Sequence, residues 1–349
     1  MVKGDRPAVM ARDPGRLYHT GLLWSLVLGA CAARNVLLVQ MVGTGSHEFV
    51  MRRLGEQLVQ RGHRVTQIRW LHAFSDLVPA NSSVEIISRR VKNAALRHRR
   101  FDAAGVFQPV SSGAWRGASS LGVALDLAQQ PHTYCEDLLG DQRLLRRMRR
   151  RRFDVAIVDV YCNVCGVAFA RALRLPVVGL YVVSVVGSEQ SNLMGLVNMP
   201  SAVVAQFTGL TPPMSLLQRL HNAFVILGFK LVSRYLLAVS DIYVQKYHPE
   251  LPTSASLMRN LDMALYNSNF LVTQPLLLPP NMQAIGCVQC TPPRPLPQNL
   301  ETFFKSSGEH GVIIFCMGIT LYDPELIPVR FIERFMRIFS RLEQKVLAT

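Results

Sequence analysis

The sequence predicts an α/β protein built on a doubly wound parallel sheet. Apolar stretches without polar alternation at residues 36–42, 153–160 and 177–183 are typical of strands buried on both faces. The first two are followed by residues 48–61 and 164–173, where apolar side chains recur at helical spacing. Strands that alternate with helices form parallel sheets, because each helix crosses one face of the sheet before the next strand begins.

The other elements predicted for the same domain have weaker sequence patterns. They are a strand at residues 63–68, a helix at 136–151, a long helical pattern at 216–243 and a strand at 263–267. The long pattern contains Lys230 and Arg234, so it is a poor membrane span. It predicts a packed amphipathic helix or helix pair, with a helix that touches lipid as the alternative.

A second unit is predicted beyond a proline-rich stretch at residues 275–297. It comprises a strand at residues 311–317, an amphipathic helix at 324–342 and the opening of a strand at 345–348. One β-α-β unit cannot bury both faces of its sheet, so we expect that most of a second domain is missing. The predicted division is a leader at residues 1–33, a first domain at 34–274, a linker at 275–309 and the start of a second domain at 310–349.

The composition excludes global disorder and narrows the choice of partners. Hydrophobic residues make up 49% of the 349 residues, and the mean hydropathy is +0.19. Much of the net charge of +15 comes from residues 89–100 and 143–152, whose apolar residues at helical spacing predict solvated helix faces. An anionic membrane or RNA is the alternative partner of these runs. Nucleic acid is not expected, since zinc-finger spacing and basic–aromatic alternation are absent from the sequence.

The N-terminus has the layout of a signal peptide. Residues 21–33 are apolar, Arg12 and Arg16 precede them, and small residues at 30–32 suit a cleavage site. A buried strand or helix is the alternative. Entry into the secretory pathway makes Asn81, in the sequon Asn-Ser-Ser, a glycosylation acceptor.

Two Cys-x-x-Cys pairs, Cys162 with Cys165 and Cys287 with Cys290, have the form of a split zinc site. The long segment between them departs from the compact spacing of structural zinc sites, so we expect no metal. Buried thiols without a partner are expected for most of the cysteines, and a disulfide remains open.

Two polar residues stand at the ends of predicted central strands. His47 follows the turn after residues 36–42, and Asp159 ends the next central strand. The carboxyl ends of parallel strands meet at one edge of the sheet, where open α/β sheets bind ligands. A dinucleotide fingerprint is excluded, because it needs glycine where Glu48 stands. The structural alternatives are capping roles, with Ser46 as the N-cap before His47 and Asp159 as an N-cap or turn residue.

Short motifs occur in a specific order along nearly the whole chain. They are GSH at residues 45–47, FDVAIVD at 153–159, ALYNS at 264–268, PLLLPPN at 275–281, PLPQNLETFFKSSGEHGVIIFCMG at 295–318 and QKVL at 344–347. Each is weak alone, but their order and spacing resemble the UDP-glycosyltransferase family, the group that includes the UDP-glucuronosyltransferases. Residues 158–178, together with LLQRLHNAFV at residues 216–225, are similar to the ceramide galactosyltransferase branch of that family.

The resemblance implies a GT-B enzyme that transfers a hexose or glucuronic acid, with inversion, from a UDP-sugar to a hydroxyl of a small lipophilic acceptor. It implies His47 as the catalytic base and Asp159 as its partner. Neutral imidazole near pH 7 can take the acceptor's proton, and a carboxylate behind the ring fixes its tautomer. The other implied contacts are Gly45 and Ser46 with the acceptor and Gly318 and Thr320 with the donor. The UDP-sugar is a substrate, and no metal or cofactor is implied.

Two departures from the family's pattern bear on activity. Ile319 follows Gly318 where the family has serine, and the rest of the donor domain, with its His-Gly-Gly loop and membrane helix, is absent from this sequence. We therefore expect no turnover by this chain, because donor contacts supply binding energy used in the transition state. The alternative is a non-catalytic form that binds a hydrophobic ligand or forms homo- or hetero-oligomers with family members. The implied location is the lumen of the endoplasmic reticulum, membrane-associated in the full-length form.

Overall fold

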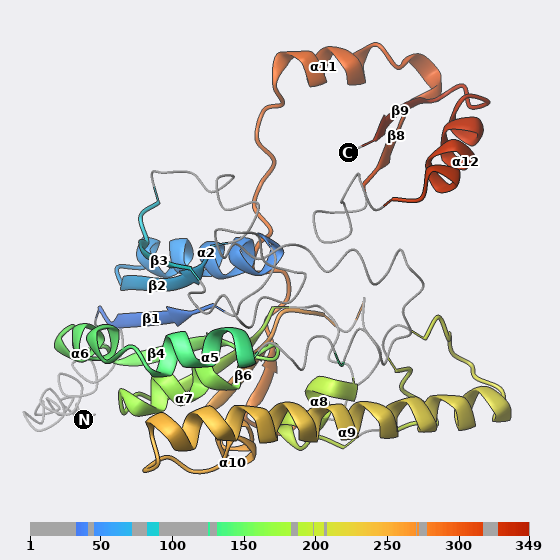
Figure 1. Ribbon diagram of the computed structural model, residues 1–349. Helices are drawn as coiled ribbons and strands as arrows, with labels where there is room; N and C mark the ends of the chain where they lie inside the picture. The colour runs from blue at the N-terminus through green and yellow to red at the C-terminus, as the bar shows by residue number, and fades with distance from the viewer. Residues whose placement is uncertain are drawn as a thin grey trace, which may run out of the picture.

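The computed structural model describes residues 33–40, 45–71, 82–90, 125, 131–182, 188–197, 199–205, 208–269, 271, 278–316 and 327–348. Seven of the strands within them form one parallel sheet in the order β3-β2-β1-β4-β5-β6-β7 (Figure 1). Their bounds are β1 Asn35–Val39, β2 Arg64–Trp70, β3 Glu85–Arg89, β4 Val155–Asp159, β5 Val177–Tyr181, β6 Met263–Tyr266 and β7 Met282–Ala284. The predicted parallel α/β fold is confirmed.

Both faces of the central strands are buried. In β1, Leu37 and Val39 belong to the larger core cluster, while Val36 and Leu38 belong to a smaller cluster. This alternation follows from the two-residue period of a strand, and an all-apolar sequence suits both faces. Val39 of β1 is aligned with Val158 of β4, so the residues that follow the two strands lie next to each other.

Helices cover both faces of the sheet (Figure 1). Their bounds are α2 Gly45–Gln60, α5 Pro131–Leu139, α6 Gln142–Arg150, α7 Val164–Ala172, α8 Ser188–Met194, α9 Leu216–Tyr247 and α10 Ser254–Arg259. Helix α2 packs on one face with Gly55 against the sheet, because a Cβ there would lie 2.9 Å from Val84 and 3.1 Å from Leu38. Helices α5, α7 and α9 share the core cluster of the other face. Because α2 begins three residues before the predicted start, His47 lies in its first turn.

Residues 136–151 form parts of two helices, and the prediction of one continuous helix is wrong. Helix α5 ends at Leu139, and α6 begins at Gln142 with Asp141 as its N-cap. The Asp141 side chain accepts a hydrogen bond from Leu144 N at 2.9 Å, which satisfies an amide of the new helix. The long apolar pattern forms one helix of 32 residues, α9, and not a pair.

Regular structure also occurs where the sequence does not predict it. Strand β3 pairs with β2 at one edge of the sheet, and β7 pairs with β6 at the other. Strand β7 and helix α11 (Gln298–Lys305) fall within residues 275–309, the stretch predicted as a linker. The division of the chain into domains stays a prediction.

The C-terminal unit has the predicted β-α-β order. Strand β8 (Val312–Phe315) pairs in parallel with β9 (Lys345–Ala348), and α12 (Val329–Phe339) lies between them in the chain. No residue of α11, β8, α12 or β9 is fully buried, and Ile314 is 60% exposed. Figure 1 shows this unit joined to the seven-stranded sheet by a single extended segment. The described residues of these four elements therefore pack without full burial of any side chain.

Several predicted features lie outside the described residues. They are the leader up to residue 32, the sequon at Asn81, the basic run at residues 91–100, and the donor contacts Gly318 and Thr320. These features stay predictions.

Candidate functional site

His47 and Asp159 contact each other directly. Nδ1 of His47 lies 2.7 Å from Oδ2 of Asp159, and the two side chains are 8% and 0% exposed. They are 112 residues apart in the chain and meet because α2 follows β1, while Asp159 ends the adjacent strand β4. The strand order reverses between β1 and β4, and open α/β sheets bind ligands at such a point. The structure thus brings together the two residues that the strand ends single out.

Both oxygens of the Asp159 carboxylate are engaged. Oδ1 accepts a hydrogen bond from Tyr161 N at 3.3 Å, and Oδ2 faces His47. An ionised carboxylate only accepts hydrogen bonds, so in this contact Nδ1 of His47 is the donor, and in the neutral form of the ring Nε2 holds the lone pair. The Tyr161 ring lies 5.5 Å from the His47 ring, measured between centroids. The imidazole is therefore oriented from two sides, and Nε2 is the atom that can take a proton from a ligand.

The turn after Asp159 is fixed to the start of α7. Asn163 Nδ2 donates to the Asp159 carbonyl at 2.9 Å, and Asn163 Oδ1 accepts from Gly166 N at 3.0 Å. Asn163 is the N-cap of α7, so the alternative that gives Asp159 this role is wrong. Gly45 is the first residue of α2, which places Ser46 inside the helix and not at the position before it.

A buried tyrosine and a disulfide support the same turn from α5. Tyr134 Oη donates to the Cys162 carbonyl at 2.9 Å. Burial raises the pKa of Tyr134 well above its usual range, and electrostatic interactions with Cys162 and Asp159 add to this effect. The phenol therefore keeps its proton and remains a donor. Cys135, the next residue of α5, is bonded to Cys165 in the first turn of α7.

The expectation that most cysteines are thiols without a partner is wrong. Cys135 and Cys165 form one disulfide, and Cys287 and Cys290 form another. Three of the four cysteines in the two Cys-x-x-Cys pairs are therefore bonded to another cysteine. In the part of the chain that the structure describes, no group of three or more His, Cys, Asp or Glu side chains could hold a metal ion.

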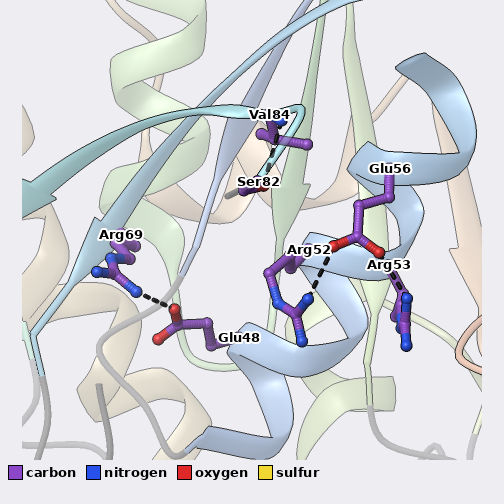
Figure 2. Close-up of polar contacts among 7 residues, drawn as sticks. All are labelled: Glu48, Arg52, Arg53, Glu56, Arg69, Ser82 and Val84. Carbon is purple, nitrogen blue, oxygen red and sulfur yellow. Dashed lines mark hydrogen bonds and ion pairs between the residues drawn. The ribbon is translucent and has the colours of Figure 1, made fainter. Parts of the chain in front are cut away.

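Charged residues tie α2 to its surroundings next to His47. Figure 2 shows Glu48, which is 1% exposed, paired with Arg69 of β2. Further along α2, Glu56 accepts hydrogen bonds from Arg52 at 2.8 Å and Arg53 at 2.7 Å. Glu48 links the first turn of α2 to the neighbouring strand, a role that the sequence analysis missed. The available signal was a basic residue near the carboxyl end of β2 together with an acidic residue in the first turn of the preceding helix.

Two hollows lined by described residues lie away from the His47–Asp159 pair. A groove of about 840 Å³ lies between β3, α5 and α6, and a hollow of about 450 Å³ lies near the start of β1 and β2. Neither is lined by His47 or Asp159. The assignment of the site therefore depends on the chemistry and placement of the pair, and not on a cavity.

Comparison with known sequences places this geometry in context. A family model described as UDP-glucoronosyl and UDP-glucosyl transferase matches residues 35–327. The chain is 24% identical over 332 residues to UDP-glucuronosyltransferase 1A9 of Mus musculus, covering 92% of this chain and 60% of that protein. It is 27% identical over 292 residues to UDP-glucuronosyltransferase 2C1 of Oryctolagus cuniculus, covering 78% and 55%. The chain thus spans about three fifths or less of these curated relatives.

Solved structures show the same fold at low sequence identity. Spinosyn rhamnosyltransferase SpnG has a TM-score of 0.52 and 16% identity, covering 90% of this chain and 64% of that one. Glycosyltransferase VinC, solved in complex with DTDP, has a TM-score of 0.50 and 16% identity, covering 90% and 66%. At these identities the likeness concerns the fold alone, and it supports the GT-B type predicted for the chain.

Proposed function

The chain belongs to the UDP-glucoronosyl and UDP-glucosyl transferase family, and from this premise we propose that its seven-stranded domain is the acceptor-binding half of a glycosyltransferase. The proposed reaction transfers a hexose or glucuronic acid, with inversion, from a UDP-sugar to the hydroxyl of a small lipophilic acceptor. The observation that carries the proposal is the buried contact of 2.7 Å between His47 Nδ1 and Asp159 Oδ2.

In this reaction, Nε2 of His47 takes the proton of the acceptor hydroxyl. The acceptor oxygen bonds to C1 of the sugar while the bond from C1 to the phosphate oxygen breaks, so the configuration at C1 inverts and UDP leaves. An alcohol is a poor nucleophile until a base removes its proton, and a positioned imidazole supplies about 10²- to 10⁴-fold in rate. Asp159 holds the ring and stabilises the imidazolium that forms.

The substrate contacts proposed around the pair come from both ends of the chain. On the acceptor side, Gly45 and Ser46 begin α2, directly before His47. On the donor side, Gly318 and Thr320 follow β8 in the sequence, outside the described residues, and backbone amides beyond the end of a parallel strand can donate to phosphate oxygens. Ile319, between them, offers only its backbone amide to such a ligand.

A phenolic acceptor whose phenolate absorbs at longer wavelength, such as a hydroxycoumarin, tests the proton transfer without a donor. We expect the chain to bind it and to raise its phenolate fraction at neutral pH, because His47 accepts the proton. His47→Gln should abolish this spectral change, and Asp159→Asn should reduce it by about tenfold or more.

A matched control for this test is His63→Gln. His63 lies at the start of β2, where its Nδ1 accepts from Arg34 N at 3.2 Å, and its replacement should leave the spectral change unaltered. Circular dichroism establishes that each variant is folded. Binding without any spectral change in the wild type, or a change that survives His47→Gln, contradicts the proposal. Sugar transfer that survives His47→Ala contradicts it as well.

A second candidate function is pairing with full-length family members without chemistry by this chain. One observation favours it: no residue of β8, α12 or β9 is fully buried, so this unit has apolar surface that another protein can cover. Co-purification of a tagged full-length relative, lost when the C-terminal unit is disrupted by Ile332→Asp, distinguishes this candidate from the first.

We propose the lumen of the endoplasmic reticulum as the compartment, with membrane association of the full-length form. The two disulfides support this proposal, since disulfides persist in oxidising compartments and are rare in the cytosol. Glycosylation at Asn81 is the matching expectation for lumenal entry. A mobility shift on N-glycosidase treatment, lost in Asn81→Gln, is the measurement that checks it.

A further inference from the structure

Helix α9 has apolar side chains on two opposite sides. On the inner side Phe229, Leu236 and Val244 are each exposed by 1% or less. The outer side carries a second row spaced by three and four residues, here called the outer stripe. The outer stripe consists of Leu217, Leu220, Phe224, Leu227, Leu231, Tyr235 and Ile242, which are 40% to 77% exposed. At 3.6 residues per turn these side chains fall within a sector of about 80°.

Packing within the domain accounts only for the inner side of α9. The helix contacts α5, α7, α8 and α10. Asn222 is buried and its side chain bonds with Ala205 N and the Pro200 carbonyl, each at 2.8 Å. The hydroxyls of Ser233 and Ser240 are also buried and donate to carbonyls one turn earlier. Since its polar side chains are satisfied inward, α9 is fixed in rotation, and the residues that the structure describes leave the outer stripe uncovered.

Two of the four Lys and Arg residues of α9 flank one edge of the outer stripe. At 3.6 residues per turn, Arg234 projects about 20° and Lys230 about 60° beyond that edge. The helix contains one acidic residue, Asp241, and its carboxylate is turned inward to accept from the first amide of α10, Ser254 N, at 2.6 Å. The outer surface of α9 therefore combines exposed apolar side chains with positive charge.

We propose that the outer stripe docks α9 flat onto the surface of an anionic phospholipid bilayer. The stripe extends about 38 Å at 1.5 Å per residue, and it is straight and narrow. Lys and Arg beside such a stripe can lay their stems along apolar surface and place their charges at the level of lipid phosphates. This inference goes beyond the proposed transferase function and does not depend on it.

A spanning orientation does not fit the same helix. Among the described residues, one helix is long enough and apolar enough to cross a membrane, and that helix is α9. However, its inner side is packed against the sheet domain and carries the buried polar residues Asn222, Ser233 and Ser240. A helix with one side committed to a folded domain can lie at the interface, with only its other side in contact with acyl chains. Figure 1 shows α9 running along the border of the molecule, with its amino-terminal half extending past the sheet.

Flotation of the full chain with lipid vesicles tests this proposal. The chain should bind vesicles of phosphatidylcholine with about 30 mol % phosphatidylserine about tenfold or more tightly than vesicles of phosphatidylcholine alone. The combined variant Leu220→Gln, Leu227→Gln and Leu231→Gln should lower binding to the anionic vesicles by about tenfold or more, without any change in charge. The combined variant Lys230→Gln and Arg234→Gln should remove most of the preference for phosphatidylserine.

The matched control for charge is Arg146→Gln with Arg150→Gln, which removes two exposed cations from α6. Binding should stay within about twofold of the wild type, because these residues are not on α9. Circular dichroism and thermal unfolding establish that the variants are folded.

Three results overturn the proposal. The first is unchanged vesicle binding by the triple leucine variant. The second is a loss with the α6 control as large as that with the Lys230 and Arg234 variant, which makes net charge the cause. The third is a dimer in the absence of lipid that becomes a monomer in the triple leucine variant, which makes the outer stripe an interface between copies. Sedimentation velocity without vesicles shows whether the chain is a dimer or a monomer.

Discussion

The first and last β-α-β units of the chain share a local pattern but differ in what surrounds them. In β1-α2-β2 the strands are packed on both faces, and Leu38 is fully buried. In β8-α12-β9 no residue is fully buried. The local pattern of an apolar strand followed by an amphipathic helix is therefore enough to form these elements. A fully buried core also requires neighbouring strands. The site needs them too, since His47 meets Asp159 because β4 pairs with β1.

Truncation of one apolar side chain in each unit should give the largest difference in stability between the two units. Leu38→Ala in β1 should lower the free energy of unfolding by about 2–5 kcal/mol, because it leaves a cavity between the sheet and α2. Ile314→Ala in β8 should lower it by less than about 0.5 kcal/mol, because that side chain is 60% exposed. Urea unfolding measures both. Equal losses would mean that the C-terminal unit has a tightly packed interior after all.

The two disulfides give a second comparison, between a bridge that closes a long loop and a bridge that closes a short loop. Cys135 and Cys165 are separated by 30 positions, whereas Cys287 and Cys290 are separated by 3. Loop-closure entropy grows with loop length, so Cys135→Ser with Cys165→Ser should cost about 3–4 kcal/mol. Cys287→Ser with Cys290→Ser should cost about 2 kcal/mol. Thermal unfolding without reductant gives the ranking, and a larger loss from the shorter bridge would reverse the expected order.

Most elements of the fold could be predicted because their patterns are local. The buried strands β1, β4 and β5 are apolar on both faces, so their sequences alone indicate a parallel sheet. The edge strands β3 and β7 could not be predicted. Strand β3 is half exposed, and β7 has three residues inside a proline-rich stretch. Both become strands through pairing with a neighbour, which is information that their own residues do not carry.

The candidate site likewise has a part that could be predicted from the sequence and a part that could not. The meeting of His47 and Asp159 could be expected, because both follow buried parallel strands whose ends must share an edge. The contacts that hold this pair in place could not be expected from the sequence. The pairing of Cys135 with Cys165 depends on how α5 lies against α7, and the pairing of Glu48 with Arg69 depends on how α2 lies over β2. Packing of one element on another decides these contacts, and periodicity does not reveal it.

An ion pair at the edge of the sheet is expected to contribute little to stability. The hydrogen bond from Arg151 lowers the pKa of Glu85 in β3 below its usual 4.5, despite partial burial. Thr66 Oγ1 also donates to this carboxylate at 3.2 Å. A carboxyl with a lower pKa in the folded state stabilises the fold above its unfolded pKa. That stability is lost as the pH falls through the folded pKa.

Glu85→Gln should therefore lower the free energy of unfolding at pH 7 by only about 0.5 kcal/mol, because the Glu85 side chain is 49% exposed and solvent screens the pair. The difference from the wild type should shrink below pH 4.5 and vanish once the carboxyl is protonated in both states. Glu301→Gln in α11, whose pairing with Lys305 at 3.0 Å joins two exposed side chains, is the control and should change stability less. Urea unfolding across this pH range decides the matter, since a difference that does not vary with pH assigns the Glu85 effect to packing and not to charge.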